Sequence, residues 1–207
     1  MLDFFETYTY SKRTMKGMIN FLFEVGMLKK TPRTGYQFLG SGKESVAEHS
    51  FRTAIIGYVL SLQEPEADSQ KITLMCLFHD LHEARTGDQN YVNKRYVNVD
   101  EDRAVRDLAK NIPFGHDIIS LTREFNTGKS LEARISRDAD QLDLILELKE
   151  KQDLGNRYAG EWLHYAEKRL ITESARKMAQ EILKTDSTEW WFDKKKRFWI
   201  HNAKDDQ

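Results

Sequence analysis

The chain has 207 residues, of which 40% are apolar and 31% are charged, and its net charge is −1. This length and composition predict a single globular domain over residues 1–207 with a sizeable core. The charge balance shows no basic excess that would suggest a nucleic acid polymer as the main partner, so any phosphate recognition is expected in a local pocket.

The pattern of apolar residues predicts an all-α fold. The three prolines all fall between periodic segments, where helix boundaries are expected. The predicted helices cover residues 10–30, 45–62, 68–85, 99–111, 115–126, 130–153 and 157–184. The best marked is 130–153, where Leu and Ile recur at helical spacing behind Ser130, a candidate N-cap.

Two irregular stretches flank the most informative helices. Residues 31–43 contain three glycines and precede the 45–62 helix, and residues 86–94 follow the 68–85 helix. Loops in such positions commonly carry substrate contacts. Residues 188–201 mix three tryptophans with a basic run, which predicts packing on the fold or on a second copy.

A histidine and an aspartate stand side by side at His79 and Asp80. In a helix their side chains diverge by about 100°, so they can share one ion only if other helices complete the ligand set. His49 and Asp140 are the candidates for this. Imidazole and carboxylate together suit a divalent metal that activates water for hydrolysis, and manganese, cobalt, iron, nickel, zinc and magnesium all stay open.

The order His, His-Asp, Asp on helices resembles the HD superfamily of metal-dependent phosphohydrolases. Its branch of bacterial 5′-deoxynucleotidases and their eukaryotic relatives is similar in five ordered segments, at residues 33–36, 44–50, 78–84, 87–88 and 140–142. The resemblance runs from about residue 15 to residue 150, and residues 157–207 carry no matching motif.

This resemblance implies a compact HD-domain helical bundle and a homodimer. It also implies one divalent metal held by His49, His79, Asp80 and Asp140. The implied reaction is removal of phosphate from a (deoxy)ribonucleoside 5′-monophosphate by water that the metal activates.

Glu83 lies four residues after His79 and three after Asp80, hence on the same helical face. It matches the family's catalytic glutamate, whose carboxylate can accept or orient a proton of the attacking water. Arg33 matches an arginine that addresses the nucleotide, and its guanidinium can clamp two phosphate oxygens. Tyr36 stands where a tryptophan is more usual beside that arginine.

Asp88 and Lys94 match two further family positions. The resemblance implies that Asp88 bonds a sugar hydroxyl and that Lys94 holds the phosphate. Residues 89–93 lack the prolines of the relatives, so the pocket wall is expected to differ here.

Three residues near the candidate ligands are not expected to bind metal. His82 is expected to support the site or to be structural. Asp138 and Asp143 flank Asp140 and are expected to point away from its face, solvated or paired.

Two alternatives stay open. An HD-type enzyme could hydrolyse another phosphate ester, such as an alarmone or a cyclic nucleotide, although residues 81–84 lack the Glu-Asp pair of alarmone hydrolases. A non-catalytic nucleotide-binding module with a structural metal would not require Glu83, Arg33 and Lys94. Turnover distinguishes the two classes.

The sequence also predicts where the chain works. It has no run of eighteen apolar residues, and residues 1–6 lack the basic segment of a signal peptide. We therefore expect a cytoplasmic protein that does not attach to membranes. Cys76, the single cysteine, lies in an apolar run and is expected to be a buried thiol.

Overall fold

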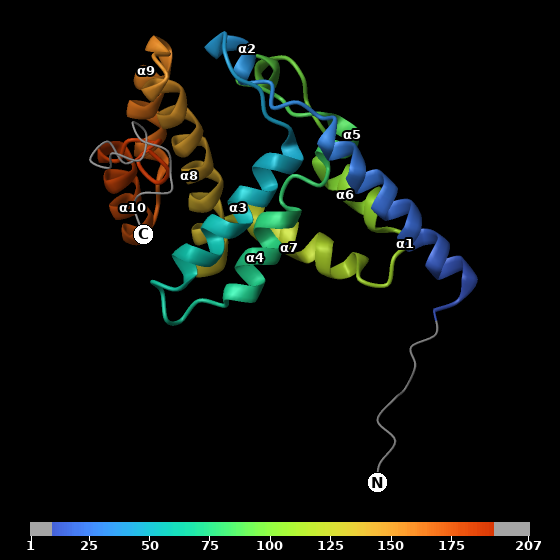
Figure 1. Cartoon of the computed structure of the whole chain (residues 1–207). Helices are drawn as coiled ribbons and strands as arrows, with labels where there is room; N and C mark the ends of the chain where they lie inside the picture. The colour runs from blue at the N-terminus through green and yellow to red at the C-terminus, as the bar shows by residue number, and fades with distance from the viewer. Residues whose placement is uncertain (1–9, 193–207) are drawn as a thin grey trace, which may run out of the picture.

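The structure is a computed structural model that describes residues 10–192. Within this range it is helical and contains no strand, which confirms the predicted all-α class (Figure 1). Pro32 and Ser45 form an isolated antiparallel bridge that closes the loop between them. None of the helices in the described range has the length and apolarity needed to cross a membrane.

The elements follow one another along the chain as a series of helices joined by short turns. In order they are α1 (Lys12–Val25), η1 (Gly26–Lys29), α2 (Tyr36–Leu39), α3 (Val46–Ser61), α4 (Ser69–Phe78), α5 (Glu83–Thr86), η2 (Asn93–Arg95), α6 (Glu101–Ala109), α7 (Gly115–Thr127), α8 (Leu131–Asp153), α9 (Arg157–Ala166), η3 (Glu167–Arg169) and α10 (Glu173–Lys184).

The predicted helices 45–62, 99–111, 115–126 and 130–153 are present as α3, α6, α7 and α8. Local capping explains why α3 and α8 begin where they do. Ser130 accepts a hydrogen bond from the Ala133 amide, as its position predicted. Ser45 and Glu48 form a reciprocal capping box at the start of α3, directly before His49.

Three predicted helices are interrupted in the structure. The 10–30 segment tightens into η1 after Val25, and the 68–85 segment leaves α-helical geometry after Phe78. The turn at 79–82 is closed by bonds between residues three apart, such as the Glu83 amide to the Asp80 carbonyl. The 157–184 segment breaks at Leu170, whose backbone is extended.

Helix α8 is the centre of the fold. It packs against α3, α4, α7, α9 and α10, and Figure 1 shows it between α3 and the α9–α10 pair. Ile135, Leu142 and Ile145 are fully buried along it. A Cβ on Gly57 of α3 would lie 2.7 Å from the Cys76 sulfur, so this glycine permits the close contact of α3 with α4. Tight packing of these helices fixes the residues that they carry relative to one another.

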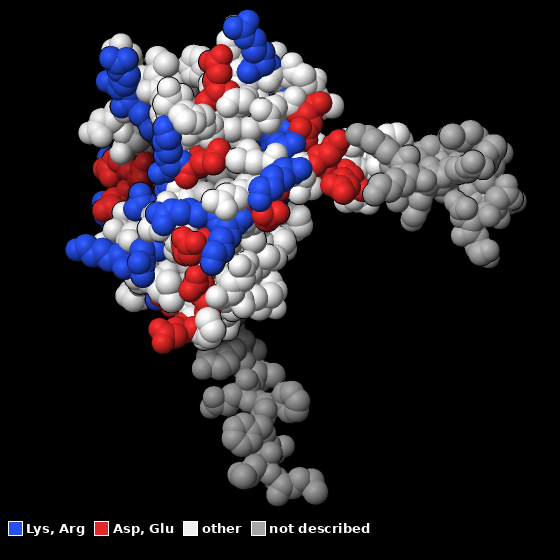
Figure 2. All heavy atoms as spheres, turned by 90° about the vertical axis from the view of Figure 1, so that its left-hand side faces the viewer, with Lys and Arg blue, Asp and Glu red and all other residues white. Residues whose placement is uncertain are grey.

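Charges of both signs mix on the outer face of the C-terminal helices. Figure 2 shows the side of the molecule where α9 and α10 lie, with Lys and Arg interspersed among Asp and Glu. This face offers no broad basic patch for a nucleic acid polymer. The predicted tail contacts lie partly outside the described residues, which end at Phe192; Trp190 is exposed.

Candidate active site

Four side chains from three parts of the chain converge beside α8. The His49 Nε2 lies 3.3 Å from the His79 Nε2 and 3.2 Å from an Asp140 oxygen. The His79 Nε2 lies 3.2 Å from an Asp80 oxygen. Donor atoms that share one ion at about 2.1 Å stand about 3.0–3.4 Å apart, so these side chains could hold one divalent cation. The structure thus brings together all four predicted metal ligands.

Hydrogen bonds on the far side of each imidazole orient the two histidines. The Nδ1 of His49 lies 2.6 Å from an Asp143 oxygen, and the Nδ1 of His79 lies 2.7 Å from the Cys76 carbonyl. Both partners accept, so each Nδ1 carries the proton and each Nε2 faces the cluster. This is the arrangement that a metal-binding histidine requires.

Asp143 is paired, which was one of the two expected possibilities, but the prediction that it points away from the site was wrong. The side chain is 1% exposed and bonds His49, because residues three apart on a helix differ by only about 60° in direction. Its second oxygen accepts from the Arg52 Nε at 2.5 Å. Arg52 also bonds Glu147 and Glu150 of α8 and so fixes the carboxylate that orients His49. The spacing from His49 to Arg52 and from Asp140 to Asp143 is the signal that could have identified both.

The electrostatics of the cluster favour a cation between its members. Burial would lower the pKa of His49, but its contacts with Asp140 and Asp143 raise that pKa to about 10. Burial would likewise raise the pKa of Asp80, yet His79, His49 and Arg33 hold it well below its usual range. Positive charge at the Nε2 atoms, whether a proton or a metal ion, is therefore strongly stabilised.

Glu83 follows the tight turn after Asp80 and faces the same cavity. Its side chain is largely buried, and one of its carboxylate oxygens has no hydrogen-bond partner among the described residues. Burial together with the charges of Asp80 and Asp88 raises the pKa of Glu83 to about 9. A carboxylate of this kind is a strong proton acceptor when ionised.

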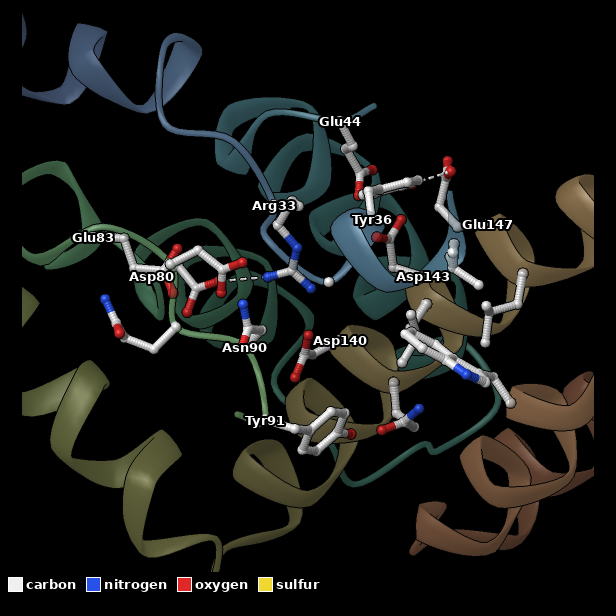
Figure 3. Close-up of a pocket in the computed structure, with 18 of the residues that line it drawn as sticks. Arg33, Tyr36, Glu44, Asp80, Glu83, Asn90, Tyr91, Asp140, Asp143 and Glu147 are labelled. Carbon is white, nitrogen blue, oxygen red and sulfur yellow. Dashed lines mark hydrogen bonds and ion pairs between the residues drawn. The ribbon is translucent and has the colours of Figure 1, made fainter. Parts of the chain in front are cut away.

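Arg33 extends from the 31–35 loop toward the cluster, and its Nη1 lies 3.4 Å from an Asp80 oxygen (Figure 3). Its backbone amide donates to the Glu44 carbonyl at 2.9 Å. Asp88 fixes the same loop, because one of its oxygens accepts from the amide of Thr34 at 2.5 Å and from the hydroxyl of that residue at 2.9 Å. The two irregular loops are thereby joined beside the cluster.

Tyr36 is tied to α8. Its hydroxyl donates to Glu147, and Figure 3 shows its ring on the α2 side of the cavity, away from Asp80. Lys94 lies in η2, exposed to solvent at the rim of the same cavity. The cavity has a volume of about 290 Å³, near the lower limit of about 300 Å³ for ligand pockets.

The far wall of this cavity was not predicted from the sequence. It is formed by residues of the 89–94 segment, of α8 and of the α9–η3 region, namely Tyr91, Gln141, Leu144, Trp162 and Arg169. Trp162 and Arg169 lie beyond the five short segments in which the sequence resemblance was recognised. No local signal in the sequence connects them with the cluster.

His82 and Asp138 stay outside the four-residue cluster. His82 is buried, with its Nε2 3.8 Å from a Glu101 oxygen. Asp138 is buried and paired, which was one of the two expected possibilities. It accepts hydrogen bonds from the amides of Ile171 and Thr172, at 2.7 Å each. These bonds explain why the predicted 157–184 helix breaks at Leu170: two backbone amides are turned toward α8.

Fold and site define an all-α protein with a four-residue cluster that could hold a metal ion, beside a cavity of about 290 Å³. A family model described as "HD domain" matches residues 25–183. The bovine protein named 5′-deoxynucleotidase HDDC2 is 30% identical over 155 residues, which cover 72% of this chain and 75% of that protein. The human protein of the same name is 28% identical and covers 70% and 74%.

Solved structures have a fold similar to that of this chain. A conserved hypothetical protein from Pyrococcus furiosus superposes with a TM-score of 0.69 at 28% identity, over 81% of this chain and 99% of that one. The chain belongs to the HD domain family, which confirms the resemblance seen in its sequence. It is a metal-dependent phosphohydrolase of the HD type.

Proposed function

We propose that this protein removes the 5′-phosphate from deoxyribonucleoside monophosphates. The observation that carries the proposal is that two residues of the cluster, Asp80 and Asp140, line the same cavity as Arg33 and Glu83. The bovine and human relatives named 5′-deoxynucleotidase support the same substrate class.

The cluster of His49, His79, Asp80 and Asp140 would hold one divalent cation. When bound, such a cation supplies Lewis acidity toward the phosphoryl group and lowers the pKa of water. The donor set fits this role because hydrogen bonds at Nδ1 direct the Nε2 atoms of both imidazoles toward the cluster.

The chain's own residues then have distinct tasks. Arg33 binds non-bridging phosphate oxygens and neutralises the charge that grows on them during attack. Glu83, whose carboxylate lines the same cavity, takes the proton of the attacking water and holds it until the nucleoside oxygen leaves. Lys94 adds positive charge at the rim.

Asp88 lies where it can meet the sugar. One of its oxygens holds Thr34, which leaves the other for a hydroxyl of the substrate. We propose that this contact contributes to the choice between deoxyribose and ribose.

We also propose that residues 1–207 form one domain and that the protein works as a cytoplasmic homodimer. The close packing of α9 and α10 on α8 supports a single domain. An exposed apolar stripe on α3, formed by Phe51, Ile55, Tyr58, Val59 and Leu62, supports self-association.

The test is phosphate release from a panel of deoxy- and ribonucleoside monophosphates. The protein is stripped of metal and reloaded singly with manganese, cobalt or magnesium, with Asp80→Ala as the control. The expected result is metal-dependent release that favours deoxynucleotides and is absent in the control. No release from any monophosphate by metal-loaded protein would refute the proposal and direct the assay to alarmones and cyclic nucleotides.

A further inference from the structure

The cavity continues beyond the metal cluster toward the C-terminal helices. Tyr91, Leu144, Trp162 and Arg169 line it there, and the same four residues line an adjoining cavity of about 280 Å³. Figure 3 shows Tyr91 at the edge of the cavity below Asp140. The far end is thus mainly aromatic and aliphatic, in contrast to the carboxylates of Asp80, Glu83 and Asp140 at the metal end.

A guanidinium lies over an aromatic ring at this far end. The Cζ of Arg169 is 5.0 Å from the centroid of the Tyr91 ring, which is cation–π geometry. Within residues 10–192 Arg169 makes no ion pair, so its N–H groups are not neutralised by a carboxylate. The N–H groups of this guanidinium can therefore donate hydrogen bonds to a neutral acceptor on a ligand.

Helix α8 fixes the distance between the two ends of the cavity. Asp138 accepts hydrogen bonds from the amides of Ile171 and Thr172, two and three residues after Arg169. The same helix presents Asp140 to the metal cluster two residues later and Leu144 to the far end. The spacing between the two ends is therefore fixed for a ligand that spans them.

A buried donor without a partner in the described part of the chain also lines the cavity, at Gln141 of α8 between Asp140 and Leu144. The side-chain amide nitrogen of Gln141 is buried and has no hydrogen-bond partner among the described residues. Because a buried donor without a partner is destabilising, an acceptor from a ligand or from water is expected at this position.

We propose that this far end is the subsite for the nucleobase. The base stacks against Trp162 and Tyr91, and Arg169 and Gln141 donate hydrogen bonds to acceptor atoms on its edge. The inference rests on the proposed nucleotidase function and adds the part of the substrate that the motifs leave unassigned. Aromatic side chains and arginine planes are the groups that stack on unpaired bases.

A second phosphate is the less suitable occupant. Phosphate sites gather several converging cations, whereas Arg169 presents its face to a ring and is accompanied by Leu144 and Trp162. The cationic groups of the cavity that suit phosphate, Arg33 and Lys94, belong to the loops beside the metal cluster.

The test separates base binding from phosphate binding. KM for the preferred deoxynucleotide is measured for Tyr91→Ala, Trp162→Ala and Arg169→Ala, together with the inhibition constant of inorganic phosphate. Loss of one stacking partner is expected to raise KM about tenfold, with kcat and the phosphate inhibition constant changed less than twofold. Tyr158→Ala, an exposed aromatic of α9 away from this cavity, is the matched control and should leave KM unchanged.

Three outcomes would overturn the inference. An unchanged KM in all three variants would show that the base lies elsewhere. A parallel rise in the phosphate inhibition constant would show that the residues only support the fold of the site. Stronger loss of binding for a nucleoside diphosphate than for the monophosphate would assign the subsite to a second phosphate.

Failure of the proposed nucleotidase function can be distinguished from failure of the nucleobase subsite. If the wild type releases no phosphate, calorimetric binding of the deoxynucleotide to the same variants still tests the subsite, because binding requires no turnover. Trp162 packs on the core, so its variant can lose stability; Tyr91 and Arg169 are exposed, and their variants keep the test valid.

Discussion

The two ends of the cavity are built in different ways. At the metal end His49 and His79 are 0% and 3% exposed, and each has its Nδ1 fixed by a hydrogen bond. At the far end Tyr91 is 58% exposed, and a cation–π contact holds it against Arg169.

This difference separates chemistry from substrate choice. Bond cleavage requires donor atoms held within about 0.5 Å, which burial and a second hydrogen bond provide. Base recognition tolerates more freedom, and exposed residues can change without disturbing the core. The predictions below test this division, beginning with the largest effect.

Asp140→Ala should abolish both metal binding and phosphate release. Without this carboxylate the cluster loses a ligand, and we expect at least about a 1000-fold fall in kcat/KM together with loss of bound metal. Phosphate release and elemental analysis measure the two effects. Asp117→Ala, an exposed aspartate on α7, is the control; a variant at 140 that kept its metal and its activity would contradict the assignment.

Asp138→Ala should disturb the far end and the fold while sparing the metal end. The change removes three hydrogen bonds to Ile171 and Thr172, so we expect a loss of about 2–4 kcal/mol in the free energy of unfolding. Urea unfolding measures it. Metal content should stay at the wild-type level. If metal binding fell as much as in the Asp140 variant, the two ends would not be separable.

Asp143→Asn should lower the metal affinity of the cluster without abolishing metal binding. The amide keeps the shape of the side chain but lacks the charge that orients the His49 imidazole, so we expect metal affinity to fall about tenfold. Competition with a chelator gives the affinity. Equal affinity in variant and wild type would show that the His49 ring is held by packing alone.

Glu44→Gln should change how stability depends on pH in metal-free protein. Burial, with Asp143 and Glu147 nearby, raises the pKa of Glu44 from 4.5 to about 7. The folded state therefore binds this proton more tightly than the unfolded state does. The resulting stability is complete below about pH 4.5 and is lost as the pH rises through 7.

Glutamine stays neutral, so the variant should not lose stability in this way. Between pH 5 and pH 8 its free energy of unfolding should rise by about 1–2 kcal/mol relative to that of the wild type. Urea titrations at both pH values measure the gain. Glu66→Gln, at an exposed position, should show no such gain. Parallel pH profiles for wild type and Glu44→Gln would contradict the raised pKa.

Much of the metal end could be predicted because its members lie in local motifs. His49 follows a capping box, and Asp80 and Glu83 share one turn, so short segments already show their chemistry. The direction of Asp143 was misjudged, although its spacing from Asp140 carried the information. Trp162 and Arg169 could not be predicted, because their role depends on how α9 folds back on α8.

The sequence by itself determined the helical class, most helix boundaries and the residue types that could bind a metal. These follow from periodicity, capping and ligand chemistry, which act over a few neighbouring residues. Only the tertiary structure decided that the 79–82 turn leaves the helix and that Asp138 anchors the C-terminal helices. It also decided that an aromatic wall faces the cluster. Contacts between residues far apart in the chain depend on the packing of whole helices, and no local pattern encodes them.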